Sequence, residues 1–391
     1  MKIVHIITRL IIGGAQENTL ITCKGLAERC HDVTLITGPA LGPEGQLFEQ
    51  TKNQKYKTIV IDSLRRQINP AYDIPAYKEI KKILSQLQPD IVHTHSAKAG
   101  ILGRFAAYNL SPRPKIVHSV HGLSFHEYQN HLLNKFYIAV EKAVAKKTDA
   151  FICVADAMTQ KSLAVGIGRA DQYTTAYSAI EEEQFSNPIT AQSRNDFRKK
   201  YDVPNDAIVL VTIARLFHLK GHNYIIESAQ ELAKRFENCV WLFAGDGILR
   251  YRMQKQVADL GLSDKFRFTG LLPPSDIPLA IQSSDILVHC SLREGLARVL
   301  PQAMLCGKPA ISFDIDGANE VVNPDTGRLV EPENVEQLID ACAELIANEN
   351  LRIKLGRAGR EFVREKFSPK TMVDTIEKIY NNLLSNTNSQ H

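Results

Sequence analysis

The sequence predicts an α/β protein of two domains, each built on a parallel β-sheet. Three observations support this prediction. Strand-like and helix-like segments alternate along the whole chain, this alternation lapses once near the middle, and the chain has 391 residues. Alternating strands and helices are typical of parallel sheets covered by helices. One hydrophobic core rarely extends beyond about 250–300 residues, so this length favours two domains.

Six short segments rich in Ile and Val in the first half have the length and composition of buried strands. Helical periodicity separates them, for example over Tyr77–Leu87 and Gly100–Tyr108. We therefore expect a first domain over residues 1–183. Its strands are predicted near Ile3–Ile7, Val33–Ile36, Thr58–Ile61, Ile91–Thr94, Ile116–Val120 and Ala150–Val154.

The periodicity lapses over Tyr177–Asn187, YSAIEEEQFSN, which we interpret as a hinge. A second alternating series follows and predicts a domain over residues 184–367. The tail, Pro369–Leu384, has the pattern of a last helix. Strands of the second series are predicted near Ile208–Ile213, Val240–Ala244, Phe266–Thr269, Ile286–His289 and Ala310–Phe313.

Composition and charge narrow the class of protein. No apolar run approaches the roughly 18–20 residues that span a bilayer, and the N-terminus lacks the apolar core of a cleavable signal. Seven cysteines without C-x-x-C spacing favour reduced thiols in a cytoplasmic protein. Residues 1–183 hold 22 Lys and Arg against 17 Asp and Glu, an excess of five. This excess fits an anionic membrane face or a phosphate-bearing acceptor, and equally an ordinary solvated surface.

The most informative stretch runs from 287 to 322, LVHCSLREGLARVLPQAMLCGKPAISFDIDGANEVV. A strand ends in a polar turn that carries Glu294 and Gly295, and a short helix with Pro301 in its first turn follows. Ligands of open α/β sheets bind at the carboxyl ends of the strands. A helix N-terminus attracts an anion there, and a carboxylate accepts hydrogen bonds from hydroxyls. A nucleotide sugar carries an anionic group beside a polyol, so these features fit a nucleotide-sugar site.

Other polar residues follow predicted strands. Gly13-Gly14-Ala15 comes after the first strand, where glycines let a backbone approach a phosphate or a sugar; a simple tight turn is the alternative. His93 and His95 share one strand face, and His118 and His121 lie on a strand expected to be adjacent. No Asp, Glu or Cys stands at ligand spacing beside them, so we predict no metal. We expect His93 and His118 in the core, and His95 and His121 in a cleft.

The segment 287–322 resembles the signature of the family 4 retaining glycosyltransferases of GT-B fold. In that family a Glu is followed, after seven residues, by a second Glu, in a pattern like EG(F/L)xxxxxEAMxxGxPVIxxDxxGxxEVV. The second Glu is Gln302 here, an uncharged amide that can still accept from a ribose hydroxyl. Residues that fall on the pattern are Glu294, Gly295, Ala303, Met304, Gly307, Pro309, Asp314, Gly317 and Glu320.

The resemblance extends over nearly the whole chain and includes Gly13-Gly14-Ala15, His121-Gly122, Arg215 and Lys220-Gly221. It implies two Rossmann-like doubly wound domains that face each other across a cleft. The domain at 1–183 would take the acceptor, the domain at 184–367 would bind the nucleotide sugar, and a crossover helix, 368–391, would return to the first domain.

The resemblance also implies roles for particular residues. Glu294 would bind sugar hydroxyls, while Arg215 and Lys220 would grip the diphosphate, whose negative charge grows as the glycosidic bond breaks. The catalytic set would be Glu294, His121, Arg215 and Lys220. The acceptor side would include His95, Lys98 and Arg104, for which solvated surface is the alternative interpretation. The donor-binding set would be Gly13, Gly14, Arg215, Lys220, Gly270, Leu271, Glu294, Gly295, Leu296, Ala297, Val299 and Gln302.

The expected activity is transfer of a hexose-type sugar from a nucleotide diphosphate sugar, with UDP favoured, to a saccharide or lipid-linked acceptor. The family implies retention of configuration and no metal, so Asp314-Ile315-Asp316 is interpreted as structural rather than as a metal-binding D-x-D motif. We expect no cofactor and no nucleic-acid partner, and a cytoplasmic protein working at the inner face of a membrane. Two alternatives stay open: a nucleotide-sugar epimerase of the same fold, and a non-catalytic GT-B sugar-binding or structural protein.

Overall fold

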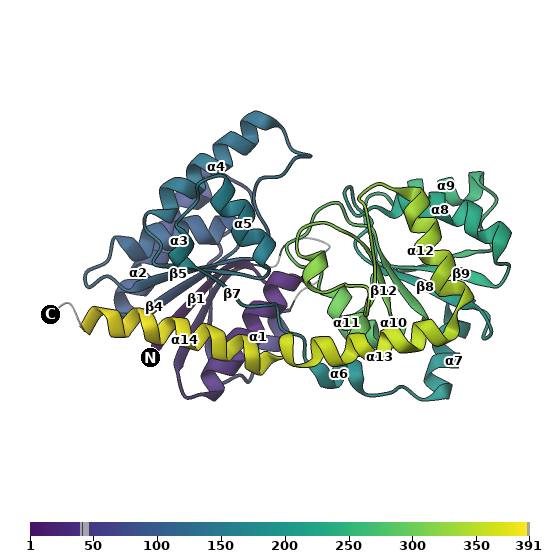
Figure 1. The fold of residues 1–391 in the computed structure, drawn as a ribbon. Helices are drawn as coiled ribbons and strands as arrows, with labels where there is room; N and C mark the ends of the chain where they lie inside the picture. Colours follow the sequence, from purple (N-terminus) through teal and green to yellow (C-terminus); the bar gives the residue numbers. More distant parts are fainter. Residues whose placement is uncertain (40, 42–46, 389–391) are drawn as a thin grey trace. The chain divides into compact units, whose positions relative to one another are not determined.

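The structure, a computed structural model, describes residues 1–39, 41 and 47–388. The chain forms two compact units (Figure 1). Unit 1 comprises Met1–Ala179 and Pro369–His391, and unit 2 comprises Ile180–Ser368. Each unit contains one β-sheet with helices packed against it, which confirms the predicted α/β fold with two sheets.

The strands of unit 1 are β1 (Lys2–Arg9), β2 (Asp32–Gly38), β3 (Lys57–Val60), β4 (Ile91–His95), β5 (Lys115–Val120), β6 (Ala150–Cys153) and β7 (Tyr173–Thr175). They form one sheet in the order β3-β2-β1-β4-β5-β6-β7, in which every pair is parallel. Strands β1 and β4 are buried almost throughout because both sheet faces are covered. The helices are α1 (Gly14–Glu28), α2 (Pro70–Leu87), α3 (Ala97–Tyr108), α4 (His131–Ala145), α5 (Asp156–Ala164) and α14 (Pro369–Asn388).

The strands of unit 2 are β8 (Ile208–Ile213), β9 (Cys239–Ala244), β10 (Phe266–Gly270), β11 (Ile286–His289), β12 (Ala310–Phe313) and β13 (Gly327–Val330). Their order is β10-β9-β8-β11-β12-β13, again with parallel pairs. The helices are α6 (Glu182–Ser186), α7 (Ala191–Lys200), α8 (His222–Arg235), α9 (Arg250–Asp259), α10 (Ile277–Gln282), α11 (Val299–Leu305), α12 (Val335–Ala347) and α13 (Glu349–Lys366).

All eleven predicted strands are present, and the two that the sequence did not predict are the edge strands β7 and β13. Their sequences, YTT and GRLV, are short and only partly buried, so they lack the apolar run that marks the other strands. The last predicted helix is α14, which packs on α1 within unit 1 (Figure 1). There the His31 imidazole lies 2.7 Å from the Glu377 carboxylate. Residues 389–391 of that expected helix lie outside the described part of the chain.

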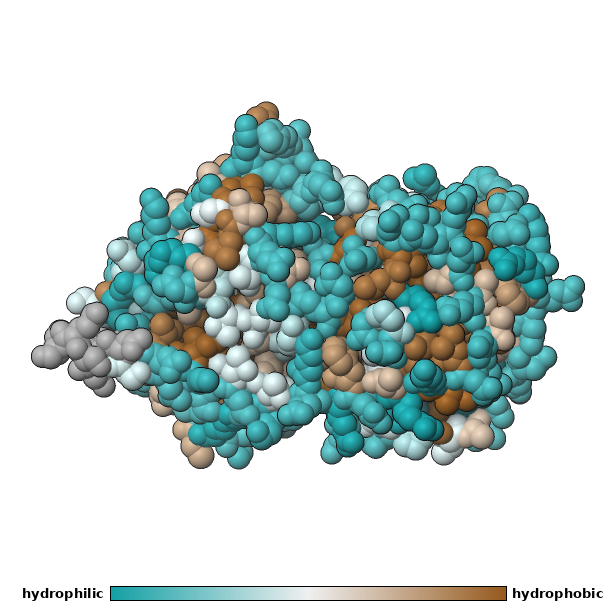
Figure 2. Space-filling view, viewed as in Figure 1, coloured by the Kyte–Doolittle hydropathy of each residue, from teal (hydrophilic) through white to brown (hydrophobic). Residues whose placement is uncertain are grey.

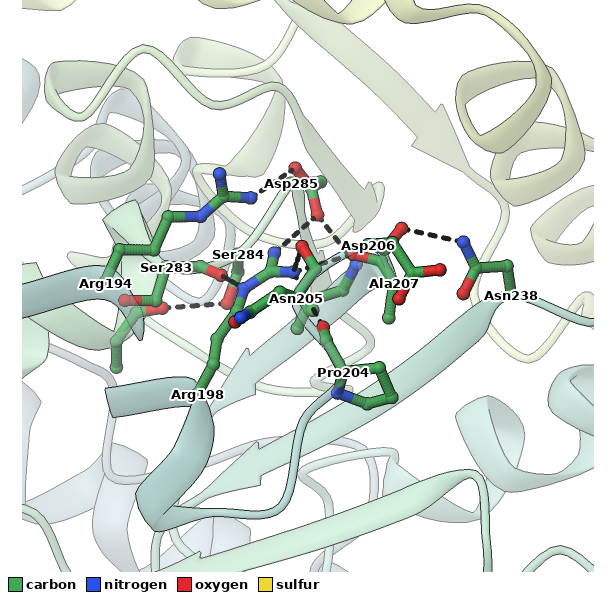
Figure 3. Close-up of polar contacts among 12 residues, drawn as sticks. Arg194, Arg198, Pro204, Asn205, Asp206, Ala207, Asn238, Ser283, Ser284 and Asp285 are labelled. Atoms are coloured by element: carbon green, nitrogen blue, oxygen red, sulfur yellow. Dashed lines mark hydrogen bonds and ion pairs between the residues drawn. The ribbon is translucent and has the colours of Figure 1, made fainter. Parts of the chain in front are cut away.

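A buried arginine forms a hydrogen-bond cluster at the amino edge of the unit 2 sheet (Figure 3). The Arg198 guanidinium donates to the Asp285 carboxylate, which also accepts the Val209 backbone N–H at 2.8 Å. Because Asp285 precedes β11 and Val209 lies in β8, this cluster ties the starts of the two central strands together. The other acceptors of Arg198, at 2.9 to 3.0 Å, are the carbonyl oxygens of Ser283, Pro204, Asn205 and Ala207.

No helix among the described residues combines the length and the apolar character needed to cross a membrane.

Candidate active site

Several of the predicted site residues of unit 2 lie where its strand order reverses. The order runs outward from β8 through β9 on one side and through β11 on the other, so the crevice between β8 and β11 is the switch point of the sheet. Ligands of doubly wound sheets bind at this place, outside the carboxyl ends of the strands. We call the two loops that leave these strands, residues 214–221 and 290–298, the unit 2 edge.

An ion pair lies at the unit 2 edge. The Lys220 ammonium contacts the Glu294 carboxylate directly, and the side chains are 20% and 21% exposed. His289 Nε2 lies 3.5 Å from the same oxygen of Glu294. Burial opposes ionisation of Glu294, but Lys220 and His289 outweigh it and hold the pKa of the carboxyl well below its usual range. Glu294 is therefore an ionised hydrogen-bond acceptor at neutral pH.

Close backbone packing holds the two loops together. The Leu292 N–H donates to the Leu219 carbonyl at 2.8 Å, and the Ser291 hydroxyl donates to the same oxygen at 3.1 Å. Gly221 has a left-handed φ of +69°, and a Cβ there would lie 1.8 Å from the Cys290 carbonyl oxygen. Only glycine fits at this position, so the Lys-Gly pair places Lys220 against the loop of Glu294.

Asp316 positions Glu294, a role that sequence reasoning did not identify. The Glu294 backbone N–H donates to Asp316 Oδ2 at 2.8 Å. Asp316 itself has a left-handed φ of 49°, which an aspartate tolerates better than most residues do. The D-x-D segment thus has a structural use in this chain, because its second carboxylate holds the backbone of the predicted catalytic residue.

Arg215 follows β8 at the same edge of the sheet, and its side chain is exposed. The guanidinium carbon lies 5.1 Å from the centroid of the Phe217 ring, a cation–π contact. The structure brings Lys220 and Glu294 into contact and places Arg215 on the loop that carries Lys220. Convergence of all three on one diphosphate sugar stays a prediction.

Glycines let further loops approach the unit 2 edge. Gly245 and Gly270 form an isolated β-bridge, and a Cβ on Gly245 would lie 2.0 Å from the Ala214 carbonyl oxygen. Leu271, the next residue in the predicted donor-binding set, is 50% exposed. The backbones around 214, 245 and 270 therefore lie close together beside the switch point.

The rest of the predicted donor-binding set in unit 2 lies in and before α11. Leu296, Ala297 and Val299 are 7 to 8% exposed, so their side chains pack into the unit. Gln302 lies in the helix, where its N–H donates to the Arg298 carbonyl at 3.1 Å. Contact of this segment with a donor stays a prediction, and for the three apolar residues it would run through the backbone.

Several histidine side chains of unit 1 lie together at the switch point of its sheet, between β1 and β4. His5 Nδ1 lies 2.9 Å from His95 Nε2, and His95 Nδ1 lies 3.1 Å from His121 Nε2. These three rings form a hydrogen-bonded row from the interior of the sheet to the end of β5, which we call the histidine row. Gly13 and Gly14 lie at the end of the loop after β1, where α1 begins at Gly14.

The buried histidines of unit 1 are uncharged at neutral pH. Burial lowers the pKa of His5 to about 3 and lowers those of His93, His95 and His118 well below the ordinary value. His93 lies beside the row and hydrogen-bonds to the Tyr380 hydroxyl at 2.6 Å and the Ser119 hydroxyl at 2.7 Å. These four buried side chains are therefore polar but neutral.

Comparison with known proteins identifies the family. A model described as Glycosyltransferase Family 4 matches residues 12–183, and one described as Glycosyl transferases group 1 matches residues 193–362. This chain belongs to the family 4 glycosyltransferases. The predicted membership of this family and the predicted GT-B fold are thus confirmed.

Relatives of this glycosyltransferase match it over most of their length. UDP-Gal:alpha-D-GlcNAc-diphosphoundecaprenol alpha-1,3-galactosyltransferase of Escherichia coli is 26% identical over 396 residues, which are 99% of this chain and 98% of that protein. The capsular polysaccharide biosynthesis glycosyltransferase CapM of Staphylococcus aureus is 25% identical over 325 residues, 80% of this chain and 83% of CapM. The structure of Anabaena HepE in complex with UDP has a TM-score of 0.81 at 20% identity and covers 98% of this chain and 100% of that chain.

The structure corrects two acceptor-side predictions for this glycosyltransferase. Arg104 is 0% exposed and donates to the Glu141 carboxylate at 2.8 Å and to the Gly100 carbonyl at 2.9 Å, so it is an internal cation and not an acceptor contact. His95 is 1% exposed and lies inside the histidine row rather than on a cleft surface. The helical pattern around Arg104 did not reveal this burial, because a lone arginine on a helix is usually solvated.

The remaining unit 1 predictions have mixed outcomes. Lys98 pairs with Asp73, and its side chain is 12% exposed, so most of its charge is already engaged. His93 and His118 are buried, as expected. His121 is partly exposed at the end of the row. His5 was missed, since its neighbours in the sequence are apolar and its partners lie about 90 residues away.

Three imidazoles of unit 1 have the spacing of a metal site. Ligand nitrogens of His5, His93 and His95 lie within 4.8 Å of one another. However, both ring nitrogens of His93 and of His95 already take part in hydrogen bonds. An ion would have to break these bonds in a fully buried place that offers no anionic ligand among these three residues, so the arrangement fits neutral imidazoles better.

Proposed function

We propose that this glycosyltransferase moves a hexose-type sugar from a UDP-sugar to a saccharide or lipid-linked acceptor, with retention of configuration and without a metal or other cofactor. The Lys220–Glu294 pair at the switch point of unit 2 carries the proposal, because it sets a cation for phosphate beside an ionised acceptor for sugar hydroxyls. The E. coli relative, which acts on UDP-Gal and a diphosphoundecaprenol-linked sugar, and the UDP bound by HepE support the choice of donor and acceptor.

The proposed chemistry uses the charges of the unit 2 edge. Negative charge gathers on the diphosphate as the glycosidic bond breaks, and Lys220 and Arg215 stabilise it more in the transition state than in the ground state. On donor binding, Lys220 turns from Glu294 to the phosphates. Glu294 then accepts hydrogen bonds from sugar hydroxyls. These two cations supply the positive charge that a metal ion would otherwise bring.

Retention follows, in this proposal, from attack on the face that the diphosphate leaves. A phosphate oxygen takes the proton of the acceptor hydroxyl as the new glycosidic bond forms. The side chains of the histidine row and the nearby hydrogen-bonded pairs, Thr8 with Ser96 and His93 with Ser119, are imidazoles and hydroxyls. This favours the route over a glycosyl ester on the enzyme, which needs a carboxylate.

We place this reaction in the cytoplasm, at the inner face of a membrane. The cysteines among the described residues are unpaired, which fits a reducing compartment. A lipid-linked acceptor would be presented at the membrane surface, as the substrate named for the E. coli relative suggests.

The test begins with thermal shift across UDP-, GDP- and ADP-sugars, because a bound donor raises the melting temperature by mass action. We expect a UDP-sugar to stabilise the protein most and to be turned over with a lipid-linked saccharide, in EDTA as well as without it. NMR of the product should show the donor's anomeric configuration. An inverted product or loss of activity in EDTA contradicts the mechanism. Isomerised sugar without acceptor would instead indicate an epimerase, and no turnover of any donor a sugar-binding protein.

A further inference from the structure

A histidine beside the Lys220–Glu294 pair has a buried nitrogen whose use the structure does not yet explain. His289 is the last residue of β11, and its side chain is 5% exposed. Its Nε2 is buried and has no hydrogen-bond partner among the described residues. Buried polar atoms of this kind are nearly always bonded in native proteins, so a partner is expected in some state of the molecule.

The nearest candidate partner is the carboxylate of Glu294. His289 Nε2 lies 3.5 Å from Glu294 Oε1, which is too long for a good hydrogen bond. The Lys220 ammonium contacts this same oxygen directly. The Glu294 backbone is held separately, by its N–H bond of 2.8 Å to Asp316 Oδ2. Two donors therefore approach one carboxylate oxygen, and the lysine is the closer of the two.

The surroundings of this carboxylate make the loss of the lysine costly. Figure 2 shows hydrophobic residues in the middle of unit 2, around the place where Figure 1 has β12, α10 and α11. Leu296 and Val299, shortly after Glu294 in the chain, are 7% and 8% exposed. In partly apolar surroundings a carboxylate without a partner is strongly destabilised, and a hydrogen bond to it is strengthened.

We propose that His289 is a positioning residue that replaces Lys220 as the hydrogen-bond donor to Glu294 when a diphosphate binds. This inference rests on the proposed function, in which Lys220 turns to the phosphates. The Nε2–H of His289 then closes on Glu294 Oε1 and keeps the carboxylate ionised and oriented for the sugar hydroxyls. The exchange requires a proton on Nε2, which an imidazole supplies in its Nε2–H form.

Lys220→Met tests this exchange without any ligand, because it removes the ammonium and keeps an unbranched side chain. Histidine-selective ¹⁵N labelling and two-bond ¹⁵N–¹H spectra report the proton on His289 Nε2. We expect that proton in the wild type, with a downfield shift in Lys220→Met and also in the wild type with UDP. The shift should disappear in Lys220→Met/Glu294→Ala. Lys234→Met is the matched control, since Lys234 pairs with Glu231 at the surface of the same unit and is 68% exposed.

Two results of these spectra would overturn the exchange: an Nε2 without a proton in Lys220→Met, or a proton whose shift is the same in Lys220→Met and in Lys234→Met. Thermal shift with UDP is read separately. Failure of UDP to bind would count against the proposed function, whereas the spectra of Lys220→Met still decide whether His289 engages Glu294.

Kinetics supply a second readout. His289→Phe should lower kcat by about 10- to 100-fold with little change in KM, because a hydrogen bond to a charged acceptor is lost while Lys220 and Arg215 still bind the phosphates. His289→Gln places an amide N–H near the same point and should recover most of kcat. Equal kcat in His289→Phe and wild type, or equal loss in the two variants at unchanged melting temperature, would contradict a positioning role.

The histidine row of unit 1 carries a second, independent inference. Each contact in the row needs one donor and one acceptor, so neutral rings allow two proton arrangements. In one, His5 donates to His95, His95 donates to His121, and His121 holds its proton on Nδ1. In the other, every donor reverses and His5 holds a proton on Nε2. That nitrogen is buried and has no hydrogen-bond partner among the described residues.

Orphaned buried N–H groups are rare in proteins, which favours the first arrangement. We infer that His5 and His95 are positioning residues that hold His121 in the Nδ1–H form. Under the proposed function, His121 then donates a hydrogen bond to a sugar oxygen and does not act as a base.

The same labelled samples test this second inference without substrate. We expect the Nδ1–H pattern for His121 in the wild type, a mixture of both forms in His5→Phe, and restoration in His5→Asn, whose amide N–H replaces the Nδ1–H donor. His121 found as the Nε2–H form in the wild type, or an unchanged pattern in His5→Phe, would refute it. Circular dichroism of His5→Phe separates loss of the row from loss of the fold.

Discussion

The two units differ in charge at the same position of their folds, the switch point of the sheet. At the switch point of unit 2, an ionised carboxylate meets a lysine, and both remain about one-fifth exposed. At the switch point of unit 1, His5 and His95 are buried and stay neutral because burial outweighs their basicity, and the partly exposed His121 ends the row. The shared fold sets where a ligand can bind, and the residues at the strand ends decide which chemistry is present.

The cations of the two units differ in the same way. Arg104 lies in α3 and Lys220 in the loop after β8, and the sequence suggests an anion contact for both. Arg104 is fully buried and bound to Glu141, whereas Lys220 keeps a contact with solvent beside Glu294. One cation therefore stabilises its own unit, while the other keeps the exposure that the proposed contact with a diphosphate requires. The experiments below test this contrast, from the largest expected effect to the smallest.

Arg104→Met should destabilise the protein by about 3–5 kcal/mol, because it leaves the Glu141 carboxylate without its buried partner. Urea unfolding followed by circular dichroism measures the change. Arg113→Met is the control, since its pair with Asp149 is 40% and 23% exposed and such pairs contribute at most about 1 kcal/mol. Equal effects of the two changes would show that Arg104 is not an internal structural cation.

Glu294→Ala should lower the transfer rate by about 10²–10³-fold while the protein stays folded, because transition-state hydrogen bonds to the donor sugar are lost. Steady-state kinetics with the best UDP-sugar measures the loss, and thermal melting checks the fold. Glu344→Ala, which breaks the exposed ion pair with Arg328 in the same unit, should keep wild-type activity. A fully active Glu294→Ala variant would remove unit 2 from the proposed mechanism.

Asp316→Ala should lower kcat/KM by about 10- to 100-fold, since it removes a charged acceptor worth about 1.5–3 kcal/mol from the Glu294 backbone. Asp316→Asn keeps an oxygen for that N–H and tolerates the left-handed φ, so it should recover most of the loss. If asparagine and alanine at 316 are equally impaired, the carboxylate acts in some way other than holding this backbone.

Acid should destabilise unit 1 through its neutral histidines. Burial lowers the pKa of His5 to about 3, so between about pH 6.5 and pH 3 the unfolded chain binds a proton that the folded chain does not. Stability therefore falls as the pH falls, by about 1.4 kcal/mol per pH unit for each such histidine. Urea unfolding at several pH values measures how the free energy of unfolding depends on pH. In His5→Asn this dependence should be weaker by one proton, whereas in the exposed His131→Asn it should match wild type. Identical slopes in all three proteins would contradict neutral burial of His5.

Much of the fold was predictable because its signals are local. Strands such as Ile208–Ile213 and Ile286–His289 are short apolar runs, and such runs with helices between them specify parallel sheets. Edge strands β7 and β13 escaped prediction because half-exposed strands need no apolar run. The candidate site of unit 2 was also predictable in part, since Gly221 and Glu294 each belong to a short local motif, Lys220-Gly221 and the segment 287–322.

Relations between distant segments were not predictable. Asp316 lies 22 residues after Glu294, and only the turn after β12 brings its carboxylate to that backbone N–H. His5 reaches His95 because β1 and β4 are neighbours in the sheet, which no local pattern shows. Arg104 was assigned to the acceptor side, with solvated surface as the alternative, because its position in the helix does not reveal the contact with Glu141 on α4.

By itself, the sequence determined the α/β class, the strands of both units other than β7 and β13, and the residue types at the unit 2 edge, because hydrophobic periodicity and glycine positions act over a few neighbouring residues. The tertiary structure decided which charges are internal and which stay partly exposed. That distinction depends on burial and on partners brought together by strand order, and both are properties of the assembled sheet rather than of any segment.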